Sequence, residues 1–280
     1  MEFCLPQTVR IAFTFIRSID CDEAVTASEN VNRLTLFIFD ENGLFVQRLD
    51  TAFLGFAYEM DVSLLPAPSY RLVAVAGYEE EQLTGIPLIP GVTSLKEVTV
   101  ATYFEQPDGF LRSAEYTLYQ GVTSLTVSPD TPEQTHMITM IQRTKSLNIT
   151  ADGLDGNEDY QVVLTGNASR YTFDNRLFFL TGNPPIIVPL MEAEDNILKG
   201  KSQINWPLNR EGLFTRIQVI NPDTGFKLID ENLHELLERV PGLDTECASS
   251  FDIGFLYTAN LKIRIYINQW LVSEKGYELQ

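Results

Sequence analysis

Short runs of alternating apolar and polar residues constrain the fold of this chain more than any other feature. The clearest runs lie between residues 31 and 78, where Leu34, Leu36 and Ile38 share one face and the run 58–64 alternates strictly. A period of two places successive side chains on opposite faces of a strand, one buried and one wet. The stretch therefore predicts antiparallel strands of a β-sandwich, with turns at 40–43 and 66–68.

The same alternation marks both ends of the chain. Residues 9–16 (VRIAFTFI) and 261–268 (LKIRIYIN) each place their aliphatic and aromatic side chains on one face. The segment 230–240 differs, because its leucines recur at helical spacing, with Asp230 as a candidate cap and Pro241-Gly242 as a stop. We therefore predict an all-β fold made of two tandem β-sandwich domains, with one short helix in the second.

The best candidate linker is the segment 128–133, SPDTPE. Its two prolines cannot donate to a strand ladder, and its other residues favour turns. We expect an N-terminal sandwich at residues 5–132 and a C-terminal sandwich at residues 133–280, both within the usual size of a domain.

Two parts of the sequence resemble a known family. The segments FIFDENGLFV, YEMDVSLLP and SYRLVAVAGY resemble the first domain of the fimbrial anchor family, and LKIRIYINQWLV is similar to its closing strand. These are the FimB-type accessory subunits of type V, fimbrillin-like pili of anaerobic Gram-negative bacteria. The resemblance implies two transthyretin-like sandwiches, attachment to the cell outer membrane through an N-terminal lipid, and contact with fimbrial shaft subunits.

A sandwich with an exchangeable edge strand can be completed by a strand from a neighbouring subunit. We interpret the first and last strands as these strand-exchange edges. An anchor keeps its first strand and a shaft subunit loses it, so the anchor role is favoured over shaft and tip roles. The alternative is a surface glycan- or matrix-binding lipoprotein, or a tip adhesin, on the same scaffold. The predicted edge residues are Val9, Ile11, Phe13, Phe15, Leu261, Ile263, Ile265 and Ile267.

Charge and targeting signals bear on the partners. A net charge of −18 opposes binding to nucleic acid, which requires clustered lysine and arginine. No segment approaches the ~18 apolar residues of a membrane helix, and the first residues lack a signal peptide. Either the protein is cytosolic or a targeting segment was removed, and the resemblance favours removal.

The three cysteines leave two alternatives open. Cys4 and Cys21 flank the first strand and could form a disulfide bond, or they and Cys247 could all stay unpaired.

The sequence carries few candidates for chemistry. His136 and His234 belong to no metal or nucleophile motif, and no phosphate-binding loop is present, so we expect no enzyme and no cofactor. The acidic turn 152–159 offers a weak calcium candidate, although Asp, Asn and Gly are also ordinary turn residues. Its candidate ligands are Asp152, Asp155 and Asp159. Core packing is the favoured role for Trp206, Trp270, Tyr171, Tyr257 and Tyr266, over a sugar-stacking platform.

Overall fold

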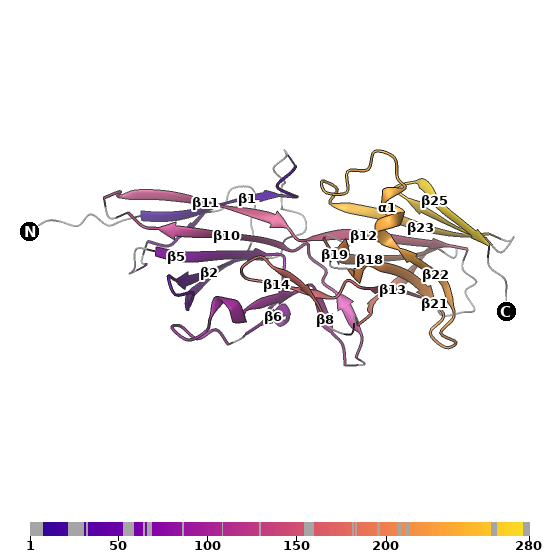
Figure 1. The fold of residues 1–280 in the computed structure, drawn as a ribbon, viewed down its shortest axis with the longest axis horizontal. Helices are drawn as coiled ribbons and strands as arrows, with labels where there is room; N and C mark the ends of the chain where they lie inside the picture. The colour runs from indigo at the N-terminus through magenta and orange to yellow at the C-terminus, as the bar shows by residue number, and fades with distance from the viewer. Residues whose placement is uncertain are drawn as a thin grey trace, which may run out of the picture. The chain divides into compact units, whose positions relative to one another are not determined.

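The computed structural model divides the chain into two compact units (Figure 1). Unit 1 comprises residues 1–101, 116–143 and 170–177, and unit 2 comprises residues 102–115, 144–169 and 178–280. The structure describes residues 8–21, 31, 33–52, 59–63, 65, 69–85, 87–107, 109–128, 130–153, 160–180, 182, 184–194, 197–206, 209–210, 213–258 and 262–276.

Seven strands of unit 1 form one sheet. They are β1 (Thr8–Ile16), β2 (Arg33–Asp40), β3 (Phe45–Ala52), β4 (Glu59–Asp61), β5 (Ser69–Ala76), β10 (Tyr119–Thr126) and β11 (Glu133–Gln142). Their order is β3-β2-β5-β10-β11-β1-β4. All neighbours pair antiparallel except β1 and β11, which run parallel from the pair Thr8–Glu133 to the pair Ile16–Ile141.

The alternation in the sequence explains the core of this sheet. Every second residue of β1 points inward, as the predicted pattern requires. The predicted turn after β2 is present, because the Asp40 carboxylate accepts the N–H groups of Asn42 and Leu44, and Gly43 has a φ of +76°. The core includes Val9, Ile11, Phe13, Phe15, Leu34, Leu36, Ile38, Met60, Val62, Tyr70, Leu72, Ala74, Leu125, Ile138 and Met140.

A second layer covers the other face of β2. Phe37 and Phe39 are fully buried there, with ring centroids 4.7 Å and 6.1 Å from that of Phe173. This explains why β2 has an almost continuous apolar sequence, RLTLFIFD. The layer contains the short turns η2 (Glu80–Gln82) and η3 (Leu95–Glu97). Its strands are ordered β15 (Leu177–Phe179), β14 (Ser169–Thr172), β7 (Thr99–Ala101) and β6 (Leu83–Thr84).

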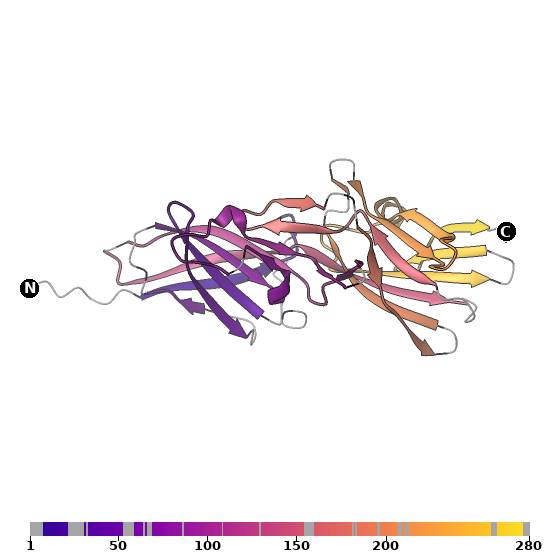
Figure 2. The ribbon, with the colours of Figure 1, turned by 90° about the horizontal axis from the view of Figure 1, so that it is seen from below.

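Unit 2 is built from two six-stranded sheets (Figure 2). The first is ordered β17 (Leu190–Glu194), β18 (Ile197–Asn205), β12 (Thr144–Asp152), β23 (Ser250–Thr258), β24 (Lys262–Ile267) and β25 (Trp270–Gly276). The second is ordered β22 (Lys227–Asn232), β21 (Arg216–Ile220), β13 (Gln161–Thr165), β16 (Ile186–Val188), β9 (Leu111–Ser113) and β8 (Tyr103–Glu105). A two-residue pairing of β19 (Asn209–Arg210) with β20 (Leu213–Phe214) completes the strands.

The predicted helix is shorter than expected. It is α1 (Leu233–Glu238), and the side chain of Asn232, not Asp230, caps it by accepting the N–H groups of His234 and Glu235. Asp230 belongs to strand β22, so it cannot cap the helix. Leu233, Leu236 and Leu237 are buried, as the helical spacing predicts. The predicted fold class, all-β with two sandwich-like domains and one short helix in the second, is confirmed.

The predicted boundary at residues 132/133 is corrected by the structure. The segment 128–133 connects β10 to β11, and these strands pair with each other in the sheet of unit 1. Unit 1 therefore extends to Arg143 and also includes residues 170–177. Neither unit is one continuous stretch of the chain. Two prolines are as compatible with a strand-to-strand connection as with a linker, because neither a connection nor a linker needs N–H donors for a strand ladder.

Candidate functional site: the strand edges

The predicted N-terminal edge residues line the core of unit 1. Val9 and Ile11 are at most 2% exposed, and Phe13 and Phe15 are 7% exposed. Strand β1 is not an edge in this structure, because β11 lies on one side of it and β4 on the other. Here the prediction needs correction: alternation identified the buried face of β1 but not its two neighbours.

The two sides of β1 are supported unequally. On one side, nine consecutive pairs join β1 to β11. On the other, only the three pairs from Arg10–Asp61 to Ala12–Glu59 join it to β4. Val9 adds two bonds at this side, since its N–H donates to the Ser63 hydroxyl at 3.0 Å and its carbonyl accepts from Val62 at 2.8 Å. Strand β1 thus fills a slot beside β11 with four alternating inward side chains.

The predicted C-terminal edge is displaced by one strand. Ile263, Ile265 and Ile267 are at most 2% exposed on β24, which lies between β23 and β25, and Leu261 lies outside the described residues. The last strand of this sheet is β25, after a turn at Asn268 and Gln269, which have φ values of 47° and 72°. Its first two side chains, Trp270 and Leu271, are 55% and 52% exposed.

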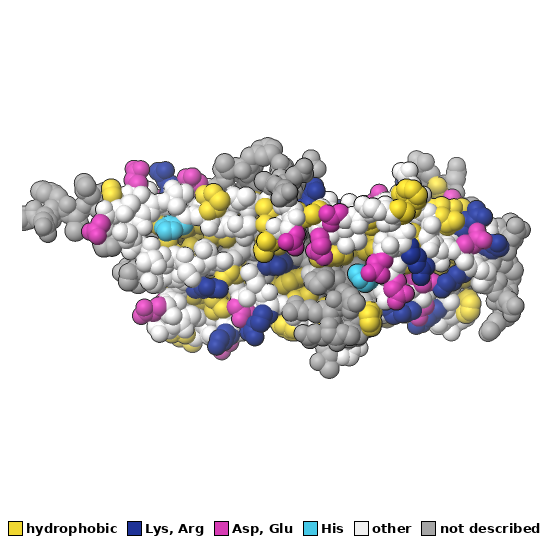
Figure 3. Space-filling model, turned by 45° about the horizontal axis from the view of Figure 1, so that its top comes forward, with side chains coloured by type: hydrophobic (Ala, Val, Ile, Leu, Met, Phe, Trp, Pro, Cys, Tyr) yellow, Lys and Arg dark blue, Asp and Glu magenta, His cyan; other side chains and the backbone are white. Residues whose placement is uncertain are grey.

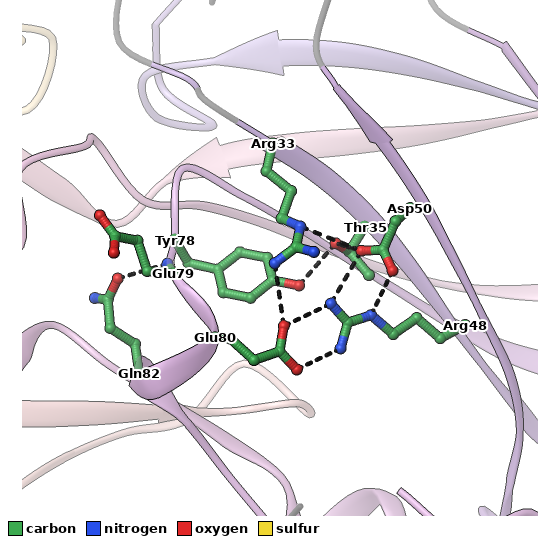
Figure 4. A network of polar contacts seen from close by, with 8 residues as sticks. All are labelled: Arg33, Thr35, Arg48, Asp50, Tyr78, Glu79, Glu80 and Gln82. Atoms are coloured by element: carbon green, nitrogen blue, oxygen red, sulfur yellow. Dashed lines mark hydrogen bonds and ion pairs between the residues drawn. The ribbon is translucent and has the colours of Figure 1, made fainter. Parts of the chain in front are cut away.

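Sequence reasoning missed a network of ion pairs beside β3, which we call the Arg48 network (Figure 4). The Arg48 guanidinium donates to the Glu80 carboxylate at 2.6 Å and 2.7 Å and to Asp50 at 2.7 Å. The network has three further members, Arg33, Thr35 and Tyr78. Arg33 donates to the Glu80 carboxylate at 3.1 Å, and the Tyr78 hydroxyl donates to the Thr35 hydroxyl at 2.7 Å. The network ties β2 and β3 to η2.

Electrostatics of the network follow from this geometry. The hydrogen bonds from Arg48 hold the pKa of the Glu80 carboxyl below its usual range, and the same contacts raise the pKa of Arg48. Burial raises the pKa of Tyr78 to about 12. Two arginines therefore face two carboxylates, which balances the charge of the network.

Replacing Arg48 by alanine removes its ion pairs and should lower the free energy of unfolding at pH 7. The loss should be only about 1 kcal/mol, because Glu80 is partly exposed and solvent screens its charge. The folded-state pKa of Glu80 is depressed, so its contribution is present above the ordinary pKa of 4.5 and is lost as the pH falls through the folded value. Urea unfolding should thus show a wild-type advantage that shrinks below about pH 4. As a control, Arg10→Ala removes an exposed 4.0 Å pair with Glu59; an equal loss there would contradict this account.

The calcium candidate gains no support from the described residues. Asp152 lies at the end of β12, and Asp155 and Asp159 lie outside the described residues. Within the described ranges, no group of three or more His, Cys, Asp and Glu side chains is placed to hold a metal. His136 lies on β11, and His234 lies on α1 with its Nε2 atom 3.3 Å from Glu238.

The expected core packing holds for some of the aromatic residues and is wrong for Trp270, which is 55% exposed on β25. Tyr171 and Tyr257 are buried. The ring centroid of Trp206 lies 5.9 Å from that of Phe251 and 4.2 Å from the Lys145 amine.

On the face shown in Figure 3, acidic and basic side chains are interspersed over the described residues. No helix among the described residues is long and apolar enough to cross a membrane.

One of the two expectations for the cysteines is wrong. Cys21 and Cys247 are each disulfide-bonded, so the expectation of three unpaired thiols is wrong. Cys4 lies outside the described residues. Disulfides persist mainly in oxidising compartments outside the cytosol.

Comparisons with known proteins give a consistent result. A family model described as fimbrillin-A associated anchor proteins Mfa1 and Mfa2 matches residues 1–275. None of the curated proteins matches the sequence significantly. A candidate adhesin of Bacteroides ovatus has a similar structure, with a TM-score of 0.74 and 18% identity over 95% of this chain and 94% of that chain.

Two further solved structures are similar over nearly their whole length. A candidate polysaccharide-binding protein of Bacteroides thetaiotaomicron has a TM-score of 0.71 and 19% identity over 98% of both chains. The fimbrial anchor protein Mfa2 of Porphyromonas gingivalis has a TM-score of 0.66 and 15% identity over 96% of this chain and 100% of that chain. At these identities the likeness establishes a shared fold.

Proposed function

We propose that this chain, which belongs to the family of fimbrillin-A associated anchor proteins, is a non-enzymatic subunit that anchors a fimbria to the cell surface. The observation that carries the proposal is the family match over residues 1–275, nearly the whole chain. The fold shared with a fimbrial anchor protein of Porphyromonas gingivalis is consistent with it. Its partners would be the shaft subunits of the fimbria, bound through protein contacts.

The shaft subunit would be held by β-strand complementation. In this mode an added strand gains affinity from main-chain hydrogen bonds and specificity from alternating side-chain pockets. The slot filled by β1 has these properties, since nine register pairs and the four inward residues of β1 define it. The anchor would keep β1 uncleaved until a shaft subunit arrives, and we propose that a shaft strand then takes the place of β1 at this slot, where only the three-residue β4 lies on the outer side of β1 among the described residues.

Attachment to the outer membrane would come from a lipid at the N-terminus. The disulfide-bonded state of Cys21 and Cys247 agrees with an oxidising location at the cell surface. Metabolic labelling of the host with a radioactive fatty acid tests this step separately. A labelled band that is lost on deletion of the gene supports the lipid, and an unlabelled surface protein would refute it.

Deletion of the gene in its host tests the anchoring role. We expect fimbriae to detach and accumulate in the medium, since the shaft loses its attachment. Fimbriae that remain attached but no longer mediate adhesion would instead identify a tip subunit. Unchanged fimbriae would overturn the proposal and make the glycan- or matrix-binding lipoprotein the leading alternative. For that alternative, Trp206, Tyr171 and Tyr257 are packed against other residues and do not form a stacking platform, and Trp270 alone of the predicted set is more than half exposed.

A further inference from the structure

A short segment on the outer side of β1 binds the main chain of this strand near its start. The segment comprises residues 59–63, which include β4, and we call it the clasp. The N–H group of Val9 donates to the Ser63 hydroxyl at 3.0 Å, and the Val9 carbonyl accepts the N–H group of Val62 at 2.8 Å. The clasp therefore holds both polar main-chain groups of the residue at this position, which must carry an N–H group.

Asp61 orients the hydroxyl that binds Val9. The Asp61 carboxylate accepts the hydroxyl of Ser63 and also accepts the Ser63 N–H group at 2.8 Å. Because the hydroxyl hydrogen is directed to Asp61, an oxygen lone pair points to the N–H group of Val9. The same bonds hold the pKa of the Asp61 carboxyl below its usual range, so Asp61 is charged at neutral pH.

The residue after Val9 is a cation in acidic surroundings. Arg10 lies opposite Asp61 in the pairing of β1 with β4, and its guanidinium is 4.0 Å from the Glu59 carboxylate. On the β11 side, Glu133 pairs with Thr8, two positions before Arg10, so it belongs to the same face of the sheet. Within the described strands β1, β4 and β11, Arg10 is the one lysine or arginine. This part of the outer face is therefore acidic except for the residue that β1 itself supplies.

We infer that the clasp selects a shaft strand with a lysine or arginine at the position of Arg10, one residue after its first inward-facing side chain. The inference rests on the strand exchange proposed above, because a strand that takes the place of β1 meets the same clasp. A basic side chain there would be attracted by the surrounding carboxylates, whereas an acidic one would add a further negative charge. An exposed ion pair adds little stability, but repulsion at the same place rejects wrong strands.

Charge exchange in the full chain tests this selection without a partner. Arg10→Glu should speed hydrogen exchange of the β1 amides about tenfold at low salt, because attraction becomes repulsion, and Arg10→Lys should leave the rate unchanged. In a chain that carries Glu59→Lys and Glu133→Lys, the order should reverse, so that Arg10→Glu slows the exchange. Asp61 is kept in every variant, because it orients Ser63. An effect of Arg10→Glu that is the same in both backgrounds would contradict selection by charge.

Labelled peptides of residues 8–16 test the same selection during strand exchange. At low salt the full chain should take up the native peptide and its Arg10→Lys variant equally, and its Arg10→Glu variant about tenfold less well. A Val9→Pro peptide has no N–H group for Ser63 and should also be taken up poorly. Equal uptake of the native and Arg10→Glu peptides would overturn the inference and leave strand exchange intact. If no peptide is taken up, the strand exchange of the proposed function fails, and the inference fails with it.

Discussion

Replacing Ile11 by aspartate is expected to lower the free energy of unfolding of unit 1 by about 4 kcal/mol, which is among the largest effects of a single substitution. Ile11 is fully buried on β1, where its side chain faces the apolar core shared with β2, β5 and β11. A carboxylate at this position would lose its hydration without gaining a cation, and a buried unpaired charge is costly. Protonation would reduce the cost but would still bury an unmatched polar group.

Ala12→Asp is the matched control for this prediction. Ala12 is the next residue of the same strand and is half-buried, on the opposite face. Its substitution should cost less than about 1 kcal/mol. Hydrogen exchange of the unit 1 amides measures the stability of this unit in both variants. Tryptophan fluorescence reports the folding of unit 2, because both tryptophans lie in that unit. Equal losses for the two variants would show that β1 does not insert one face into the core.

Replacing Gly77 by alanine should cost about 3 kcal/mol, although it adds a single methyl group. Gly77 follows β5 with a φ of +72°, and a Cβ atom there would overlap the carbonyl oxygen of Thr117. A left-handed conformation alone costs alanine about 1–2 kcal/mol, and the overlap with main-chain atoms must be relieved by a backbone shift. The N–H group of Gly77 also donates to the Arg33 carbonyl at 3.1 Å, so the shift would disturb the start of β2.

Gly43→Ala separates the strain from the overlap. Gly43 has a similar φ of +76°. A Cβ atom added there would have Leu95 Cβ as its nearest neighbour, at 4.0 Å. The loss should be about 1 kcal/mol, from the left-handed conformation alone. Urea unfolding followed by far-ultraviolet circular dichroism compares the two. If both variants lose the same stability, the close approach of Thr117 to Gly77 is not the cause.

Alternation in the sequence identified strands well where one face is buried, because the periodicity records the burial directly. This applies to β1, β5 and β24, and the helical spacing of leucines similarly identified α1. Strand β3 was missed, because its sequence, FVQRLDTA, mixes apolar and charged residues without a regular period. The parallel pairing of β1 with β11 joins residues more than a hundred positions apart, which no local pattern reveals.

The functional interpretation depended on knowledge that the pattern does not contain. Alternation shows which side chains of a strand are buried, but the neighbours of its backbone depend on the order of strands in the sheet. Val9 and Ile263 were therefore placed correctly in strands and wrongly at edges. The Arg48 network was missed because Arg48 and Glu80 are 32 positions apart. The family resemblance, by contrast, is confirmed by the match over residues 1–275.

The claim that β1 occupies a strand-accepting slot can be measured by complementation. A chain that lacks residues 1–16 is refolded with a labelled peptide of residues 8–16, TVRIAFTFI, or with a peptide in which the apolar and polar positions are exchanged. Exchanging these positions reverses the two faces of the strand, as a shift of one residue would, and places polar side chains toward the core. Only the native peptide should therefore co-elute with the chain and restore amide protection in β11. Equal binding of both peptides, or full protection of β11 without any peptide, would contradict the account.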